Sequence, residues 1–149
     1  MWDLAFTLTN ALAPVMWLAL IALPRHAALL AAVLYFGVGL LCLAYASLFL
    51  GLFSGFAGPV NEGAWLTEYS VEGLKALFAS DAWIVIGWTH YLAFDLFVGL
   101  WIARDADAKG FSRLAQVPVL LTTFLVGPIG LLAWFVIREK RARALGRWQ

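Results

Sequence analysis

Four long apolar stretches, none of which contains a lysine or an arginine, constrain the fold of this chain more than any other feature. They cover residues 4–23, 27–53, 82–103 and 114–137. Each is long enough to cross a hydrocarbon core of about 30 Å, which takes about 20 helical residues. Because backbone groups inside a bilayer must bond within the chain, these stretches are predicted to be membrane-spanning α-helices.

The connections between the stretches predict how the helices are arranged. The segment "PRH", Pro24 to His26, is too short to cross a bundle, so the first two helices are expected to be antiparallel neighbours. We therefore expect a single all-α domain, residues 1–149, built as an integral membrane four-helix antiparallel bundle. Pro128 lies in the middle of the fourth stretch, where its missing backbone donor predicts a kinked helix.

The long connection between the second and third stretches contains one further helical signal. Ser70 and Glu72 are typical of a helix start, and the apolar residues of 69–79 fall near one face. This pattern predicts a short amphipathic helix at the membrane interface, between helices two and three.

Basic residues indicate an orientation in the membrane. Arg138, Lys140, Arg141 and Arg143 closely follow the fourth stretch, and basic flanks favour the cytoplasmic side. Because four spans return the chain to its starting side, both termini are expected in the cytoplasm.

Small residues line one side of the second stretch. Ser47, Gly51 and Gly55 recur at every fourth position, which lets two helices approach closely. This face is expected either to pack within the chain or to form the contact of a homo-oligomer.

Two ionisable side chains lie inside the third stretch, in "GWTHYLAFDLFVG", residues 87–99. Trp83 and Trp101 frame this stretch about 27 Å apart, as an aromatic belt would. On that scale His90 and Asp95 lie about 10 Å and about 9 Å inside the nearer tryptophan. A carboxylate at this depth costs at least about 2.5 kcal/mol, so Asp95 is predicted to face the bundle interior, with a partner or protonated.

Polar residues of the other stretches reach the same depths. Asn10 comes level with His90, so these two side chains are expected to lie close together. The side chains that come level with Asp95 are Tyr35, Thr122 and Thr123. Asp95, His90 and Asn10 are therefore the candidate catalytic residues. The alternative is that these groups only form hydrogen bonds that hold the helices together.

Aromatic side chains surround the two ionisable residues on the third stretch, namely Trp88, Tyr91, Phe94 and Phe97. Together with Tyr35, Thr122 and Thr123, they are candidate contacts for a long apolar ligand that enters from the lipid. The alternative is that the aromatic side chains simply fill the core of the bundle.

The sequence offers little support for a metal site. It contains two histidines, His26 and His90, so one protomer cannot build a multi-histidine iron or zinc site. No cofactor is predicted. The alternative is a mixed histidine and carboxylate site from His90, Asp95 and Asp105, which could hold iron. The chain shows no nucleotide-binding or nucleic-acid-binding pattern, so nucleic acid is not an expected partner.

Two blocks, "GWTHYLAFDLFVGLWIARDA" and "PVLLTTFLVGPIGLL", resemble a known family. The chain is similar, over essentially its whole length, to the small membrane proteins grouped with plant neoxanthin synthase, known from abscisic-acid-deficient mutants. The matching positions are His90, Asp95, Asp105, Pro128 and Gly130, with Asn10 less firmly placed. Because the family has bacterial relatives, the resemblance implies a protein of the bacterial inner membrane.

The resemblance also implies a function. In plants the family is implicated in converting the epoxycarotenoid violaxanthin into neoxanthin, by an epoxide opening that yields an allene. We therefore expect a cofactor-independent isomerase acting on a polyene or epoxycarotenoid, in which Asp95 donates a proton and His90 removes one. Its partners would be membrane lipid and the carotenoid-like ligand. The alternatives are a metal-dependent enzyme that cleaves or modifies carotenoids, and a non-catalytic carotenoid-binding or scaffold subunit.

Overall fold

The computed structural model describes residues 1–55 and 70–145, and helices connected by short turns make up this described part. In chain order the elements are α1 (Trp2–Ala22), α2 (Ala27–Ala32), the π-helix η1 (Val33–Gly39), α3 (Leu40–Phe53), α4 (Val71–Leu77), α5 (Asp81–Ala108), α6 (Arg113–Val126) and α7 (Pro128–Leu145). The prediction of an all-α protein is confirmed.

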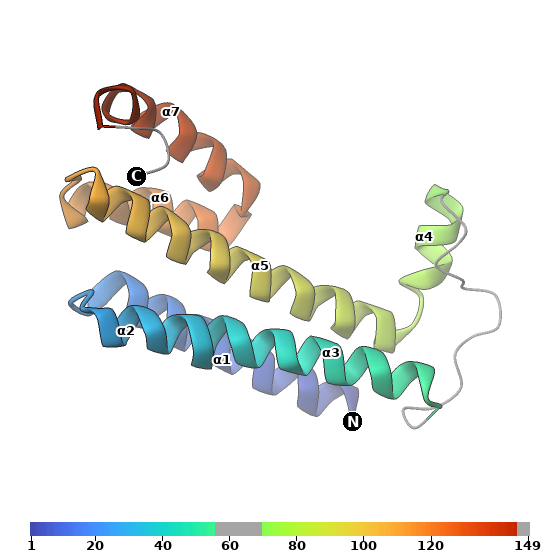
Figure 1. The fold of residues 1–149 in the computed structure, drawn as a ribbon. Coiled ribbons are helices and arrows are strands. Elements are labelled where there is room, and N and C mark those ends of the chain that lie inside the picture. Colours follow the sequence, from blue (N-terminus) through green and yellow to red (C-terminus); the bar gives the residue numbers. More distant parts are fainter. Residues whose placement is uncertain (56–69, 146–149) are drawn as a thin grey trace.

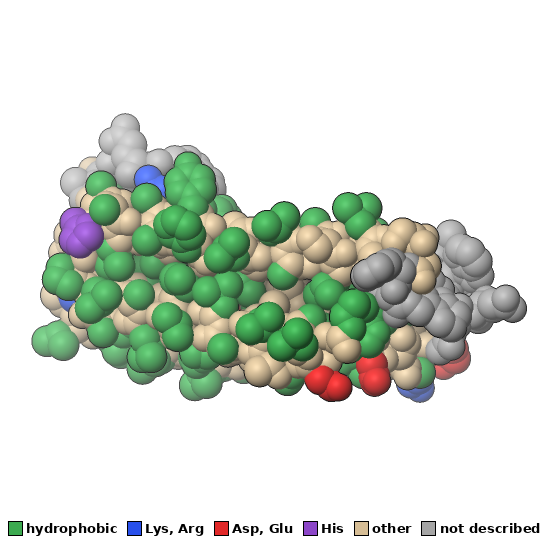
Figure 2. Space-filling view, turned by 90° about the horizontal axis from the view of Figure 1, so that it is seen from below, with side chains coloured by type: hydrophobic (Ala, Val, Ile, Leu, Met, Phe, Trp, Pro, Cys, Tyr) green, Lys and Arg blue, Asp and Glu red, His purple; other side chains and the backbone are tan. Residues whose placement is uncertain are grey.

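Three helices of the described chain are long and apolar enough to cross a membrane. They are α1, the continuous α2–η1–α3 helix (Ala27–Phe53) and α5, which agree with the first three predicted spans. Consecutive members run antiparallel, as the short first connection predicts (Figure 1). Hydrophobic side chains cover the length of the face seen in Figure 2, and charged side chains lie towards its ends.

Helix α5 lies at the centre of the molecule. It packs against α1, η1, α3 and α6, and its buried residues form the middle of the hydrophobic core. Close approach of α1 depends on Gly99, because a Cβ atom there would lie 2.2 Å from the ring of Trp17. The Trp17 ring is itself buried, so this crossing has no room for a larger residue.

The prediction that the fourth stretch forms a single kinked helix is wrong, because it forms two helices. Gly127 has φ +27° and ψ −88°, which ends α6, and Pro128 begins a separate helix, α7. Proline suits a first helical position, because its missing N–H has no helical acceptor there in any case. With 14 residues against 28 in α5, α6 runs back along only half of α5, and α7 then turns towards the end where α6 began (Figure 1).

This helical hairpin, α6–α7, changes the expected placement of the termini. The N-terminus lies at one end of the helices, and α7 leads to the opposite end (Figure 1). The expectation that both termini share one side assumed four complete crossings. In the described chain three long helices are followed by a hairpin that enters and leaves at the same end, so α1 begins and α7 finishes at opposite ends of the helices.

The connection before α5 contains the short helix that the sequence predicts near residues 69–79. Helix α4 spans Val71–Leu77, and the Ser70 hydroxyl accepts a hydrogen bond from the Gly73 N–H at 2.9 Å. Tyr69 lies outside the described residues. That α4 rests on a membrane surface remains a prediction.

The small-residue face of α3 is open in the described chain. Ser47 and Gly55 are exposed, and Gly51 is partly buried. This face therefore does little packing within the described chain, and a homo-oligomer contact through it stays a prediction.

Gly130 sets the closeness of α6 and α7, which yields a stability prediction. A Cβ atom at this position would lie 2.3 Å from the backbone nitrogen of Thr123. Gly130→Ala is therefore expected to lower the free energy of unfolding by about 1–3 kcal/mol, because backbone rather than a flexible side chain must move. Thermal unfolding of the protein in mild detergent measures the effect.

The matched control for this change is Gly39→Ala. A Cβ atom at Gly39 would meet nothing closer than the Leu34 carbonyl oxygen at 3.5 Å, an ordinary contact. Equal unfolding temperatures for the Gly130 and Gly39 variants would show that the hairpin is not closely packed.

Candidate functional site

The Asp95 carboxyl group lies against the break between α6 and α7. A Cβ atom at Gly127 would be 2.6 Å from Asp95 Oδ1 and 3.0 Å from Oδ2. Oδ2 is buried and accepts no hydrogen bond in the described chain. Backbone N–H and C=O groups at the end of one helix and the start of the next lack helical partners. The Asp95 carboxyl group therefore lies beside polar backbone groups within an otherwise apolar bundle.

A pocket between α1, α5 and α6 lies beside this carboxyl group. It has a volume of about 230 Å³, and its lining residues are Asn10, Pro14, Trp88, Tyr91, Leu92, Phe124 and Leu125. We refer to it as the Tyr91 pocket. Tyr91 connects the two features, because its hydroxyl interacts with the Asp95 carboxyl one helical turn further on.

Asn10 belongs to this pocket, although not in the way that the sequence predicts. Its side-chain oxygen accepts a hydrogen bond from Trp88 Nε1 at 3.1 Å, and its side-chain nitrogen donates to the Phe6 carbonyl. The Trp88 and Tyr91 rings stack with centroids 5.3 Å apart. The aromatic wall of the pocket is therefore held in place by an amide from α1.

His90 lies on a different flank of α5. Its side chain is exposed, its ring stacks on Phe94 at 4.5 Å, and Tyr45 of α3 lies 5.6 Å away. The expected proximity of Asn10 and His90 is wrong, because Asn10 bonds to Trp88, two residues and about 200° around the helix from His90. Equal depth in a bundle does not place two side chains on the same side of a helix.

The other predicted ligand contacts separate into three groups. Phe94 and Phe97 are exposed and line a groove on the His90 side of α5, away from Asp95. Tyr35 is 69% exposed and points away from the core. The hydroxyls of Thr122 and Thr123 bond to Pro118 and Val119 of their own helix, so neither binds Asp95. Asp95 interacts instead with Tyr91, one helical turn before it on α5.

The structure does not bring together His90, Asp95 and Asp105, the residues of the alternative metal site. His90 and Asp95 project about 140° apart from α5, and Asp105 lies about 15 Å further along the helix from Asp95. Within residues 1–55 and 70–145, no three histidine, cysteine or carboxylate side chains lie close enough together to hold an ion. These three residues cannot share one metal ion in this arrangement.

Asp105 instead anchors a buried ion cluster between α5 and α7. Its carboxylate accepts hydrogen bonds from Lys109 Nζ at 2.9 Å, from Arg138 at 2.6 and 2.9 Å, and from Trp134 Nε1 at 3.0 Å. The Lys109 side chain is completely buried, and those of Asp105 and Arg138 are 8% exposed. This cluster holds α7 onto the end of α5.

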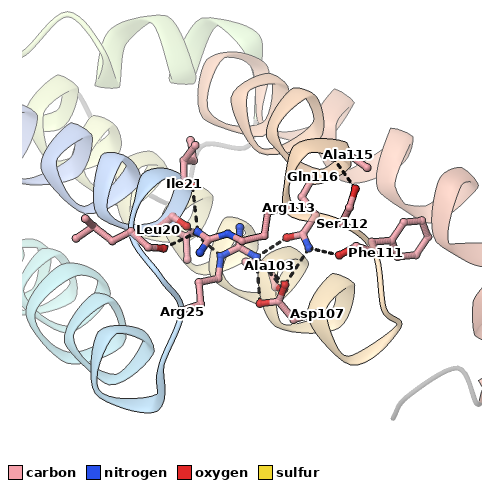
Figure 3. A network of polar contacts seen from close by, with 11 residues as sticks. Leu20, Ile21, Arg25, Ala103, Asp107, Phe111, Ser112, Arg113, Ala115 and Gln116 are labelled. Carbon is pink, nitrogen blue, oxygen red and sulfur yellow. Dashed lines mark hydrogen bonds and ion pairs between the residues drawn. The ribbon is translucent and has the colours of Figure 1, made fainter.

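A second polar network joins the α1–α2 turn to the same end of α5 (Figure 3). Arg25 donates to Asp107 at 3.0 and 3.1 Å, to the Ala103 carbonyl at 3.3 Å and to Gln116, which in turn donates to Asp107 at 2.8 Å. Burial lowers the pKa of the Arg25 guanidinium, and the hydrogen bond to Asp107 acts in the opposite direction.

Neither network was predicted from the sequence, because the third apolar stretch ends at residue 103, before Arg104. Helix α5 continues to Ala108, since its late carboxylates are neutralised by Lys109 at its own end and by basic groups from two other segments, the α1–α2 turn and α7. The Asp105–Lys109 pair has the i, i+4 spacing of a helical ion pair, which could have been noticed. No local signal connects Asp105 with Arg138, 33 residues later.

Comparison with known proteins supports the resemblance seen in the sequence. A family model described as ABA DEFICIENT 4-like matches residues 4–134, which is most of the chain. No curated protein and no solved structure matches significantly. The family match and the apolar helices fit a membrane protein connected with carotenoids. The chain belongs to the ABA DEFICIENT 4-like family.

Proposed function

We propose that this protein is a membrane-embedded isomerase that acts on an epoxycarotenoid or a related polyene by acid–base chemistry, without a cofactor. The observation that carries the proposal is the buried Asp95 oxygen, which lacks a hydrogen-bond partner in the described chain and lies at the Gly127 break. A carboxyl group is costly at such depth in an apolar bundle, so its retention argues for a chemical role. Family membership supports the class of substrate.

The proposed reaction moves one proton out and one proton back. Asp95 supplies a proton to an epoxide oxygen through the Tyr91 hydroxyl, which lines the pocket and interacts with the carboxyl group. The carbon–oxygen bond then breaks. A neighbouring C–H gives its proton back along the same path to the Asp95 carboxylate, while its bonding electrons form the new double bond. Product and substrate are isomers, so no oxidant or reductant is consumed.

The pocket suits one end of a long ligand rather than a whole one. Its volume of about 230 Å³ is below the range of roughly 300–1,000 Å³ that drug-sized ligands occupy. We propose that an end group lies between Trp88 and Phe124 while the polyene chain extends into lipid. Trp88, held by Asn10, would orient that end group towards Tyr91.

His90 has no part in this version of the reaction. It is exposed on the other flank of α5, beside Tyr45 and Phe94, and does not line the Tyr91 pocket. In this proposal Asp95 acts both as the general acid and as the general base, whereas the prediction from sequence assigned the base role to His90.

Conversion of violaxanthin by the purified protein in mild detergent tests the proposal. We expect neoxanthin to form at the same rate with and without a metal chelator. Loss of activity with chelator and its return with iron would instead support the metal-dependent alternative. Recovery of violaxanthin bound but unchanged would support a carotenoid-binding or scaffold subunit.

Tyr91→Phe tests the proton path. Removing the hydroxyl is expected to lower the conversion rate about tenfold, because one hydrogen bond to the reacting oxygen is lost in the transition state. The stack with Trp88 and the fold are kept. Because Asp95 and Tyr91 act as one unit, adding Tyr91→Phe to Asp95→Asn should lower the rate little further. Independent, multiplying losses would contradict a shared path.

A further inference from the structure

A second hollow surface lies on the flank of α5 that carries His90. One part, of about 330 Å³, is lined by Leu34, Phe97, Leu100, Trp101, Arg104, Asp105 and Ala108. The next part, of about 320 Å³, is lined by Leu34, Val38, Cys42, Ala93, Phe94 and Phe97. Because the two parts share Leu34 and Phe97, they form one groove between α5 and the α2–η1–α3 helix, the Arg104 groove.

The groove has one charged end and one apolar end. Arg104 and Asp105 lie at the end where α5 leaves the apolar region, and the Cys42 end is lined by side chains without charge. Arg104 and Phe94 are ten residues apart, which is about 15 Å along the helix. That length equals half of a hydrocarbon core of about 30 Å, or one leaflet.

Arg104 provides a charge that the described chain does not neutralise. Asp105 beside it already accepts hydrogen bonds from Lys109, Arg138 and Trp134. No ion pair or hydrogen bond joins Arg104 to another residue in the two described segments, 1–55 and 70–145. A guanidinium in this position suits a phosphate, which it can bind through two parallel hydrogen bonds.

The other wall of the groove is the π-helical part of its helix. η1 spans Val33–Gly39 and contributes Leu34 and Val38. π-helical turns are rare, and they occur frequently at functional sites. The irregular turn therefore coincides with the middle of the groove.

We propose that the Arg104 groove binds an anionic phospholipid, with its phosphate on Arg104 and one acyl chain along Phe97 to Cys42. This site is distinct from the Tyr91 pocket, because the two share no lining residue and lie on different flanks of α5. The inference does not depend on the proposed isomerase activity.

The single cysteine makes the site testable in the whole protein. Cys42 is exposed and lines the apolar end of the groove, so a bound acyl chain should shield it from N-ethylmaleimide. In mild detergent, phosphatidylglycerol is expected to slow alkylation about fivefold more than phosphatidylcholine with the same acyl chains, since one basic contact favours an anionic lipid by about that factor. Arg104→Gln should abolish this difference, and the control Lys140→Gln, an exposed lysine outside the groove, should not.

Three results would overturn the proposal. Equal protection by both lipids would show that the head group is not recognised, and protection by inorganic phosphate alone would show that no acyl chain occupies the groove. Native mass spectrometry gives an independent measurement of retained phosphatidylglycerol. Cys42→Trp, which fills the apolar end, should reduce that retention as strongly as Arg104→Gln does; unchanged retention in either variant would also contradict the site.

Discussion

Asp95→Asn is expected to lower the rate of epoxycarotenoid conversion by about 10²-fold or more while leaving the amount of folded protein in the membrane unchanged. The amide keeps the size of the side chain and its ability to accept a hydrogen bond from Tyr91. It has no carboxyl proton to transfer and cannot take one back. Turnover of violaxanthin per mole of purified protein measures the effect, and helical content by circular dichroism checks the fold.

Asp95→Leu separates a chemical role from a structural one. If Asp95 only holds helices together, the asparagine variant should convert substrate normally, and the leucine variant should be poorly folded because polar groups lose their partner. Wild-type turnover by Asp95→Asn, with equal protein in the membrane, would falsify the catalytic assignment. It would leave the carboxyl group as a contact between α5 and the α6–α7 break.

Asp105→Asn is expected to cause the largest loss of stability, about 3–5 kcal/mol. The change keeps the shape of the side chain and removes the buried negative charge against which Lys109 and Arg138 lie. Charges taken out of water are tolerated only when an opposite charge is close, so α7 should detach from α5 at lower denaturant concentration. Unfolding in detergent, followed by the tryptophan fluorescence to which the buried Trp134 contributes, measures the loss.

Glu139→Gln is the matched control, since it makes the same carboxylate-to-amide change on α7. Glu139 pairs with Arg143 at 2.8 Å, and these side chains are 35% and 71% exposed. An exposed pair of this kind contributes at most about 1 kcal/mol, so the control should unfold close to the wild type. Similar losses in both variants would mean that the Asp105 cluster is not shielded from water.

The first three spans could be predicted from sequence because membrane crossing is a local property. A helix needs only enough consecutive apolar residues to match the bilayer, and α1, Ala27–Phe53 and α5 meet that condition on their own. The fourth stretch meets it too, and the prediction failed there. Gly127 allows a backbone conformation that ends α6, and the contacts of Gly130 with Thr123 hold the returning α7 in place.

The candidate site was predicted only in part for the same reason. Asp95 stands out in the sequence because a carboxylate is costly in an apolar helix wherever its partners lie. Its partner Tyr91 is four residues away, a spacing that the helix determines by itself. The contact between Gly127 and the Asp95 carboxyl group depends on how α6 folds back along α5. The sequence near residue 95 does not predict that contact.

The sequence by itself therefore determined the all-α class, the three helices that are long and apolar enough to cross a membrane, and the family. Each of these follows from composition, periodicity or a contiguous motif. Only the tertiary structure decided that Asn10 meets Trp88 rather than His90, and that Asp105 meets Arg138 on a helix that turns back. Such pairings depend on the rotation and direction of whole helices, which are set by long-range packing at positions such as Gly99 and Gly130.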